Sequence, residues 1–126
     1  MDTLFGPSIS NLETSLRARV ARQGVLAANL ANADTPQYKR VDLDFERMLE
    51  QRGTRLQRTH PSHRGGSSGG MRLVTDPRSV TPDGNGVELE SELIENSRNA
   101  GAFVRQASVL SRLLMLRSMA ITGNAS

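Results

Sequence analysis

Apolar residues in the last third of the chain recur at alternating steps of four and three residues. The repeat holds from Leu89 to Ile121, for more than four heptads, and only Asn96 and Arg117 place polar side chains in it. Such a repeat puts its members along one face of an α-helix, as in a coiled coil. We therefore predict a long helix within residues 87–122, ended by Gly123. The repeat positions are Leu89, Leu93, Asn96, Ala100, Phe103, Ala107, Leu110, Leu114, Arg117 and Ile121.

A second helical pattern lies near the N-terminus. Between residues 8 and 33 apolar side chains recur at three- and four-residue steps, which predicts an amphipathic helix. We expect Ser8 or Ser10 to cap its start, just after Pro7. We expect the helix to stop at Asn32–Pro36, because the residue before a proline is driven out of the helical conformation. The apolar positions are Ile9, Leu12, Leu16, Val20, Ala27 and Leu30 or Ala31.

The chain between these helices has a different composition. Val41–Glu46 alternates apolar and acidic residues, as a strand does, and Phe45–Gln51 fits a short helix capped by Asp44 equally well. We favour a short extended piece that runs into one or two helical turns. Residues 51–86 hold seven of the eleven glycines and only five apolar residues, too few to offset the entropy of ordering this segment. Within it, Met71–Val74 is a candidate for one short strand. We therefore divide the chain into an N-terminal helix with a short element (1–50), a flexible middle loop (51–86) and a C-terminal heptad helix (87–126).

The predicted fold is mainly α. Two long terminal amphipathic helices pack as an antiparallel coiled-coil-like pair, and the middle segment, rich in glycine and arginine, is irregular. One such pair buries each helix on one side only, and the apolar surface around Leu110–Leu116 exceeds what one partner helix can cover. Two interpretations follow: a helical hairpin that dimerises, or a subunit whose helices finish packing inside a polymer.

Composition excludes several function classes. The chain has 126 residues, of which 37 % are apolar and only 3 % aromatic, so a small enzyme with a deep apolar pocket is not expected. It contains no cysteine, which excludes disulfides, cysteine-bound zinc and thiol catalysis. The longest strongly apolar run, Leu113–Leu116, is far shorter than the roughly 20 residues of a membrane-spanning helix.

Candidate metal ligands are few. His60 and His63 lie in the loop, which offers no third ligand and no ordered frame. Asp42, Asp44 and Glu46 alternate as calcium-loop ligands do, but apolar residues fill the gaps, so we interpret them as a solvated face. We predict no catalytic, cofactor-binding or metal-binding residue and no cofactor.

The basic residues raise nucleic-acid binding as an alternative. Fifteen arginines and one lysine give the chain a net charge of +3, and Tyr38 lies beside Lys39 and Arg40 in a stacking position. A small basic helical protein that dimerises and binds nucleic acid or another anionic polymer is therefore the alternative function. No nucleic-acid reader motif accompanies the charge.

The end of the first predicted helix carries a specific signature. Residues 28–40 read ANLANADTPQYKR, which resembles the signature N-x-A-N-x-x-T-P-G-Y-K of the flagellar rod and hook family. Gln37 stands where that signature has glycine. The short length and the segments 42–46 and 83–92 are most similar to a proximal rod member of the family. The matching residues are Asn29, Ala31, Asn32, Thr35, Pro36, Tyr38 and Lys39.

The resemblance implies a structural function without catalysis. Members of the family polymerise in the periplasm into the rod, which transmits torque from motor to hook, and leave the cell through the flagellar type III export apparatus without a cleaved signal peptide. Implied partners are further copies of the chain, other rod proteins, the protein at the junction of membrane ring and rod, and the export apparatus; neither nucleic acid nor membrane insertion is implied. Phe5 and Ile9 are similar to the element by which early subunits dock on the export gate. The assembly seam, buried between neighbouring subunits, is then Leu89, Leu93, Phe103, Ala107, Leu110, Leu114 and Ile121.

Overall fold

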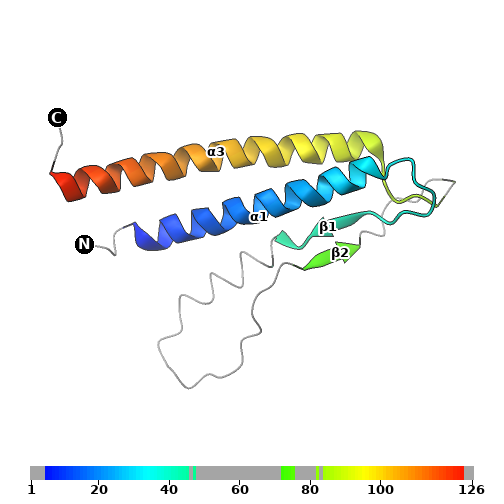
Figure 1. Cartoon of the computed structure of the whole chain (residues 1–126), viewed down its shortest axis with the longest axis horizontal. Coiled ribbons are helices and arrows are strands. Elements are labelled where there is room, and N and C mark those ends of the chain that lie inside the picture. The colour runs from blue at the N-terminus through cyan, green and yellow to red at the C-terminus, as the bar shows by residue number, and fades with distance from the viewer. Residues whose placement is uncertain (1–4, 46, 48–71, 76–81, 83, 124–126) are drawn as a thin grey trace, which may run out of the picture.

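The fold is a pair of long helices with a small sheet beside them. The structure, a computed structural model, describes residues 5–45, 47, 72–75, 82 and 84–123. Helix α1 (Gly6–Ala31) and helix α3 (Leu89–Thr122) run antiparallel side by side, and strands β1 (Val41–Leu43) and β2 (Leu73–Thr75) lie beside the C-terminal half of α1 (Figure 1). The predicted mainly α fold with paired terminal helices is confirmed.

The start of α1 differs from the prediction. The helix begins at Gly6 with Phe5 as its N-cap, and no side chain caps it. Pro7 occupies the first turn, where a missing backbone N–H leaves no hydrogen bond unmade. The predicted cap at Ser8 or Ser10 is therefore wrong, because both serines lie inside the helix. At the other end, α1 stops at Ala31, within two residues of the predicted boundary.

Helix α3 matches its prediction closely. It spans 34 residues, about 51 Å at 1.5 Å per residue. Gly123 follows in the left-handed conformation with φ 67°, and its N–H donates to the Met119 carbonyl at 3.0 Å. The predicted glycine stop is confirmed. Acidic Glu90 and Glu92 in the first turn suit the positive end of the helix dipole.

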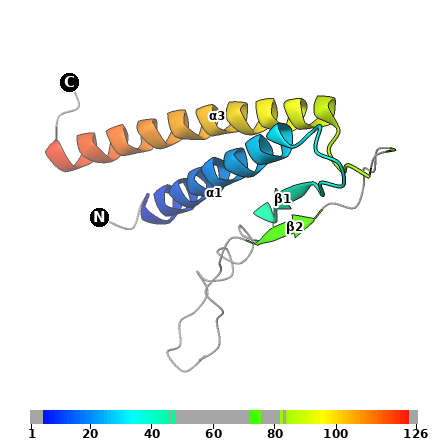
Figure 2. The ribbon, with the colours of Figure 1, turned by 45° about the vertical axis from the view of Figure 1, so that its right-hand side comes forward.

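Each of the two segments predicted to contain a strand, Val41–Glu46 and Met71–Val74, contributes one strand. β1 and β2 pair antiparallel, with Val41 opposite Thr75 and Leu43 opposite Leu73. Leu43 is buried against α1, whereas every residue of β2 is exposed. The pair is seen beside α1 in a second view as well (Figure 2). His60, His63 and most of the predicted loop lie outside the described residues.

The face that α1 buries follows the predicted apolar stripe only in part. Its buried residues are Ile9, Ser15, Ala18, Leu26 and Asn29. Of the predicted stripe, Ile9 is buried and Leu12, Leu16 and Leu30 are half-buried, whereas Val20 is 59 % exposed and Ala27 and Ala31 are exposed. Polar side chains share the contact between the helices, because Ser15, Arg19 and Gln23 bond to α3.

Helix α3 shows the same displacement. Glu92 and Asn99, seven residues apart, are its two buried residues. Leu89, Leu93 and Ile121 of the apolar repeat are 53 %, 48 % and 72 % exposed. The row that faces α1 lies roughly a quarter turn around α3 from the middle of the apolar repeat. The apolar residues of the repeat in α3, which we call the apolar flank, are therefore largely exposed in the single chain, except for the half-buried Phe103, Ala107 and Leu110.

The two ends of the helix pair differ in how they are held. At the closed end, where the C-terminus of α1 meets the N-terminus of α3, the sheet and segment 84–88 add contacts. At the open end α3 extends past the start of α1 (Figure 1). Leu114, Met115 and Leu116 in this part of α3 are exposed.

This difference predicts uneven order in the dilute chain. Long amphipathic helices depend on packing for stability, so the open end, which lacks the contacts with the sheet and with segment 84–88, should be less stable. We expect amide hydrogen exchange of the full chain to show protection near residues 22–43 and 85–99 and rapid exchange beyond residue 110, with helix content rising on assembly. Uniform protection along all of α3 would contradict this expectation.

Candidate functional site

Asn29 of the family signature joins α1 to β1 as a strand partner would. Its Nδ2 donates to the Val41 carbonyl at 2.6 Å, and its Oδ1 accepts from the Val41 N–H at 3.1 Å. The side chain is fully buried. A carboxamide carries the same donor and acceptor pair as a peptide unit, so Asn29 satisfies backbone groups on the helix-facing side of β1.

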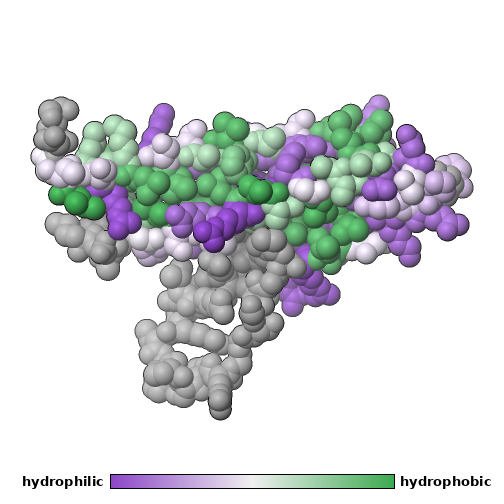
Figure 3. Space-filling view, in the orientation of Figure 1, coloured by the Kyte–Doolittle hydropathy of each residue, from purple (hydrophilic) through white to green (hydrophobic). Residues whose placement is uncertain are grey.

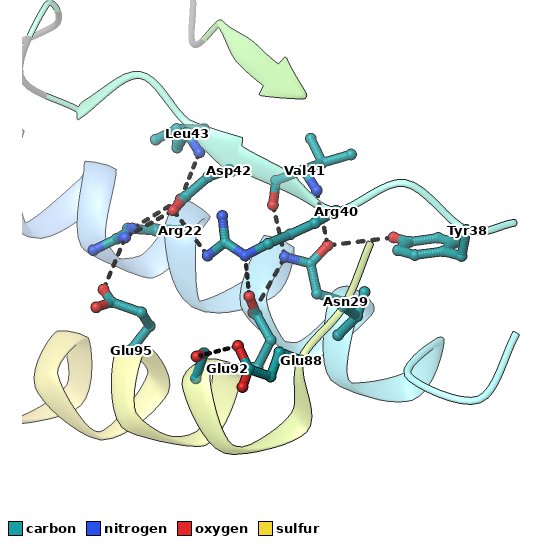
Figure 4. A network of polar contacts seen from close by, with 12 residues as sticks. Arg22, Asn29, Tyr38, Arg40, Val41, Asp42, Leu43, Glu88, Glu92 and Glu95 are labelled. Carbon is teal, nitrogen blue, oxygen red and sulfur yellow. Dashed lines mark hydrogen bonds and ion pairs between the residues drawn. The ribbon is translucent and has the colours of Figure 1, made fainter. Parts of the chain in front are cut away.

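A buried carboxylate connects the same asparagine to α3. Glu92 is 1 % exposed; Oε2 accepts from Asn29 Nδ2 at 3.2 Å, and Oε1 pairs with Arg40 Nε. A buried carboxylate is costly unless it is paired and hydrogen-bonded, and Glu92 has both kinds of partner. Figure 4 shows the three side chains meeting between α1, α3 and the chain that enters β1.

A second ion-pair cluster lies one to two turns further along. Arg22 of α1 binds Asp42 of β1 in a two-point contact, with Nε to Oδ1 at 2.9 Å and Nη2 to Oδ2 at 2.8 Å. Its Nη2 also lies 3.2 Å from Glu95 Oε2 of α3. Arg40 Nη2 lies 3.2 Å from Asp42 Oδ2, so the two clusters are continuous (Figure 4). We call these six residues the polar joint: Arg22, Asn29, Arg40, Asp42, Glu92 and Glu95.

Three residues of the polar joint, Asp42, Arg22 and Arg40, have shifted pKa values. Burial alone would raise the pKa of Asp42, but the hydrogen bonds from Arg22 and from the Leu43 N–H, with both arginine charges, hold that pKa below its ordinary value. The hydrogen bond to Asp42 raises the pKa of Arg22. Burial opposes the charge on Arg40, yet Glu92 and Asp42 outweigh it and raise the pKa of Arg40. Asp42, Arg22 and Arg40 are therefore charged near neutral pH.

The polar contact continues along the helix pair towards the open end. Glu92, Asn99 and Gln106 of α3 are spaced by seven residues and all bond to α1. Ser15 Oγ and Arg19 Nε each lie 2.9 Å from Gln106 Oε1. Asn99 Nδ2 donates to the Arg19 carbonyl at 2.9 Å and to a side-chain oxygen of α1, Gln23 Oε1, at 2.8 Å. Asn99 Oδ1 is buried without a donor.

The turn after α1 holds most of the remaining signature residues. Asn32 Nδ2 donates to the Ala28 carbonyl at 2.8 Å, and Thr35 N–H donates to the Asn32 carbonyl at 3.0 Å. Tyr38 is half-buried, with its hydroxyl 3.5 Å from Asn29 Oδ1. The signature residues whose side chains face solvent are Ala31, Thr35, Pro36 and Lys39.

Gln37 has an unusual backbone conformation. Its φ is +59°, in the left-handed region that side chains other than glycine rarely adopt. The family signature has glycine at this position, and glycine takes this conformation without a steric penalty.

The structure places the other predicted residues in different environments. Phe5 is half-buried at the start of α1, and Ile9 is buried. In the assembly seam Phe103, Ala107 and Leu110 are half-buried, and the other four members are exposed. Ile9 is therefore packed although it lies near the open end, and the seam is only partly exposed, at Leu89, Leu93, Leu114 and Ile121.

Sequence reasoning missed the ion pairs of the joint. Asp42 does not lie on a solvated face, as its alternation with Val41 and Leu43 suggested, because Arg22 and Arg40 bind it. Within the described residues, no three His, Asp or Glu side chains are grouped so that they could hold a metal ion. Every charged group of the joint is engaged by another, so the arrangement serves to hold two helices and a strand in register.

Comparison with known proteins bears on the same residues. A family model described as "Flagella basal body rod protein" matches residues 9–39, which include the whole signature. The chain is 30 % identical over 102 residues to the flagellar basal body rod protein FlgB of Bacillus subtilis, covering 77 % of this chain and 79 % of that protein. It is 35 % identical over 115 residues to the FlgB of Cereibacter sphaeroides, covering 86 % and 89 %. The chain belongs to the FlgB family of flagellar basal body rod proteins.

Membership of the FlgB family makes the chain a structural subunit of the flagellar basal body rod. The alternative of nucleic-acid or anionic-polymer binding finds no support in these matches. No helix among the described residues is long and apolar enough to cross a membrane.

The depressed pKa of Asp42 predicts a pH-dependent contribution to stability. The unfolded value is about 3.9, so the contribution is complete above that pH and is lost as pH falls through the lower folded-state pKa. We expect Asp42→Asn to lower the free energy of unfolding by about 1–3 kcal/mol near neutral pH. The difference from the parent should shrink below about pH 4 in urea unfolding followed by circular dichroism. A difference that stays constant down to pH 2 would contradict the charge pairing.

The left-handed Gln37 predicts a stabilising substitution. Gln37→Gly removes the steric penalty and should raise the free energy of unfolding by about 1 kcal/mol. Lys39→Gly is the matched control, since Lys39 has no positive φ and should lose stability to backbone entropy. Equal losses in both variants, measured by urea unfolding, would show that Gln37 is not strained.

Proposed function

We propose that this rod subunit polymerises through the assembly seam of α3. The observation that carries the proposal is the position of α1, which contacts the polar row Glu92, Asn99 and Gln106 and leaves the apolar flank open. The seam extends over about 50 Å of α3, and four of its seven residues are exposed on a single chain, so it is a surface that needs a partner. Figure 3 shows apolar side chains gathered in a band along the helix pair towards the open end.

The occupant of the flank is a neighbouring subunit of the rod. An interface built on leucine, isoleucine and phenylalanine at heptad spacing fits another helix. In this proposal the subunit acts by assembly rather than catalysis. It lies in the proximal part of the periplasmic rod, where it transmits torque from motor to hook.

The domain division follows from the same proposal. The ends of the chain, residues 1–50 and 87–126, form the single helical unit that assembles. Residues 51–86 connect these ends, and β2, among the described residues of this segment, pairs with β1.

We further propose the export route and the neighbours that the family resemblance implies. The subunit leaves the cell through the flagellar type III apparatus without a cleaved signal peptide, and contacts other rod proteins and the protein at the junction of ring and rod. Phe5 and Ile9 serve at the export gate before the chain folds. Ile9 is buried once α1 has packed, so this contact requires the unfolded N-terminus.

The exposed signature residues have a place in the same proposal. Thr35, Pro36 and Lys39 face solvent at the closed end, where a neighbouring subunit can contact them. Asn29 and Asn32 act from inside, because their side chains fix the end of α1 and its exit towards β1.

The assembly seam is tested by a charge placed on it. Leu114→Asp would bury an unpaired carboxylate between subunits, at a cost of several kcal/mol, so the variant should be exported but absent from rods. Ser108→Asp is the matched control, since it adds the same charge to an exposed position of α3 away from the seam. The measurements are swimming and the amount of chain in purified basal bodies, in a strain that makes only the variant.

Normal swimming of the Leu114→Asp strain would contradict the seam. Equal loss in both variants would show that α3 tolerates no added charge on either face, which would also remove the argument for this flank.

A further inference from the structure

Asn85 contacts the turn that follows α1, although the two are about fifty residues apart in the sequence. It lies in the segment that leads into α3 and is 1 % exposed. Its Nδ2 lies 3.1 Å from the Asn32 carbonyl oxygen, 2.6 Å from that of Ala33 and 2.8 Å from that of Thr35. Its Oδ1 accepts from the Val87 N–H at 2.8 Å. One side chain therefore contacts three carbonyls of the signature turn and fixes its own segment as well.

These contacts provide hydrogen-bond donors to backbone carbonyls of the signature turn. The Asn32 and Thr35 carbonyls already accept from N–H groups of the turn, at 3.0 and 3.3 Å, and Asn85 Nδ2 adds a second donor to each. At the Ala33 carbonyl Asn85 Nδ2 is the donor, at 2.6 Å, and a carbonyl left without a donor away from water is costly. Pro36, in the middle of the turn, has no N–H to offer. The Gly86 N–H adds a bond to the Tyr38 carbonyl at 2.7 Å, so segment 84–87 follows the turn over its whole length.

The turn also contains strain that needs an external support. Gln37 is in the left-handed conformation at φ +59°. Gly84 lies beside it, itself at φ +78°, and a Cβ on Gly84 would stand 3.5 Å from Gln37 Cγ. The segment before α3 therefore lies against the turn at Gln37, the residue with the least favourable backbone conformation.

We propose that Asn85 is the positioning residue of the signature turn. It keeps the turn in the one conformation in which the exposed residues Thr35, Pro36 and Lys39 are presented for rod assembly. The turn reaches this conformation only when the segment before α3 is in place, so the two ends of the chain must fold together before the subunit is competent to assemble. This inference rests on the proposed function for its consequence in assembly, but the effect on the turn stands on the contacts alone.

The test compares two buried asparagines in the full-length chain. Asn85→Asp keeps the acceptor for the Val87 N–H but removes the amide donors, and Asn85→Ala removes the donors without adding charge. Asn99→Asp is the matched control, because Asn99 is 2 % exposed and donates to a carbonyl of α1 outside the turn. Peptide-resolved amide hydrogen exchange gives the local order, and the chain in purified basal bodies gives assembly.

Both Asn85 variants should raise exchange in residues 33–40 about tenfold while exchange within α1 and α3 stays within about twofold. Their incorporation into rods should fall in parallel. Asn99→Asp should raise exchange near residues 19–23 and leave the turn unchanged. An equal rise along the whole chain, or release of the turn by Asn85→Asp but not by Asn85→Ala, would overturn the proposal.

The inference and the proposed function fail in different ways. Swimming by a strain that lacks the chain would contradict the rod function. If that strain does not swim, and an Asn85 variant with a released turn is incorporated as the parent is, then Asn85 has no positioning role in assembly.

Discussion

The pairing of Glu92 is the interaction on which the arrangement of the two helices depends. A carboxylate that is 1 % exposed is tolerated only where cations and hydrogen-bond donors meet it, and Asn29 and Arg40 do so from two different elements. Sliding α1 along α3 by one turn would leave that carboxylate buried and unpaired. Apolar surfaces tolerate such sliding far better, because the attraction between them has little direction. The polar joint therefore sets the register of the helices, and with it the place of β1.

Because polar residues of α3 lie against α1, many apolar residues of α3 remain exposed to solvent. A self-contained helical hairpin would place its apolar repeat between its own helices and its polar residues in solvent. This chain does much of the reverse, with Gln106 and Asn99 between the helices and Leu89, Leu93 and Ile121 exposed. The bonds inside give specificity more than stability, since each replaces a bond to water. In the proposed assembly the exposed apolar side chains of α3, whose burial would be the larger source of free energy, contact other subunits.

The sequence was sufficient for the elements but not for the faces they present. A sustained 4,3 repeat and a following glycine located α3, because both depend on neighbours along the chain. The apolar stripe of α1 predicts its buried face only in part, because the polar side chains of Ser15 and Asn29 are buried there and bond to α3. A signal was present as polar residues spaced by seven in α3, but a polar residue on a helix most often faces solvent. Asp42 looked solvated because its partner Arg22 lies twenty residues away, and the turn composition around Asn85 gave no sign of the carbonyls it reaches.

The central claim is that α3 turns its polar row inward to its own α1 and its apolar flank outward to other subunits. A density map of the assembled basal body, resolved well enough to orient side chains in the rod, tests it most directly. We expect Glu92, Asn99 and Gln106 to lie against α1 of the same chain, and Leu89, Leu93 and Leu114 to lie against helices of neighbouring subunits. A map in which the leucines face α1 of their own chain and the polar row faces a neighbour would contradict it.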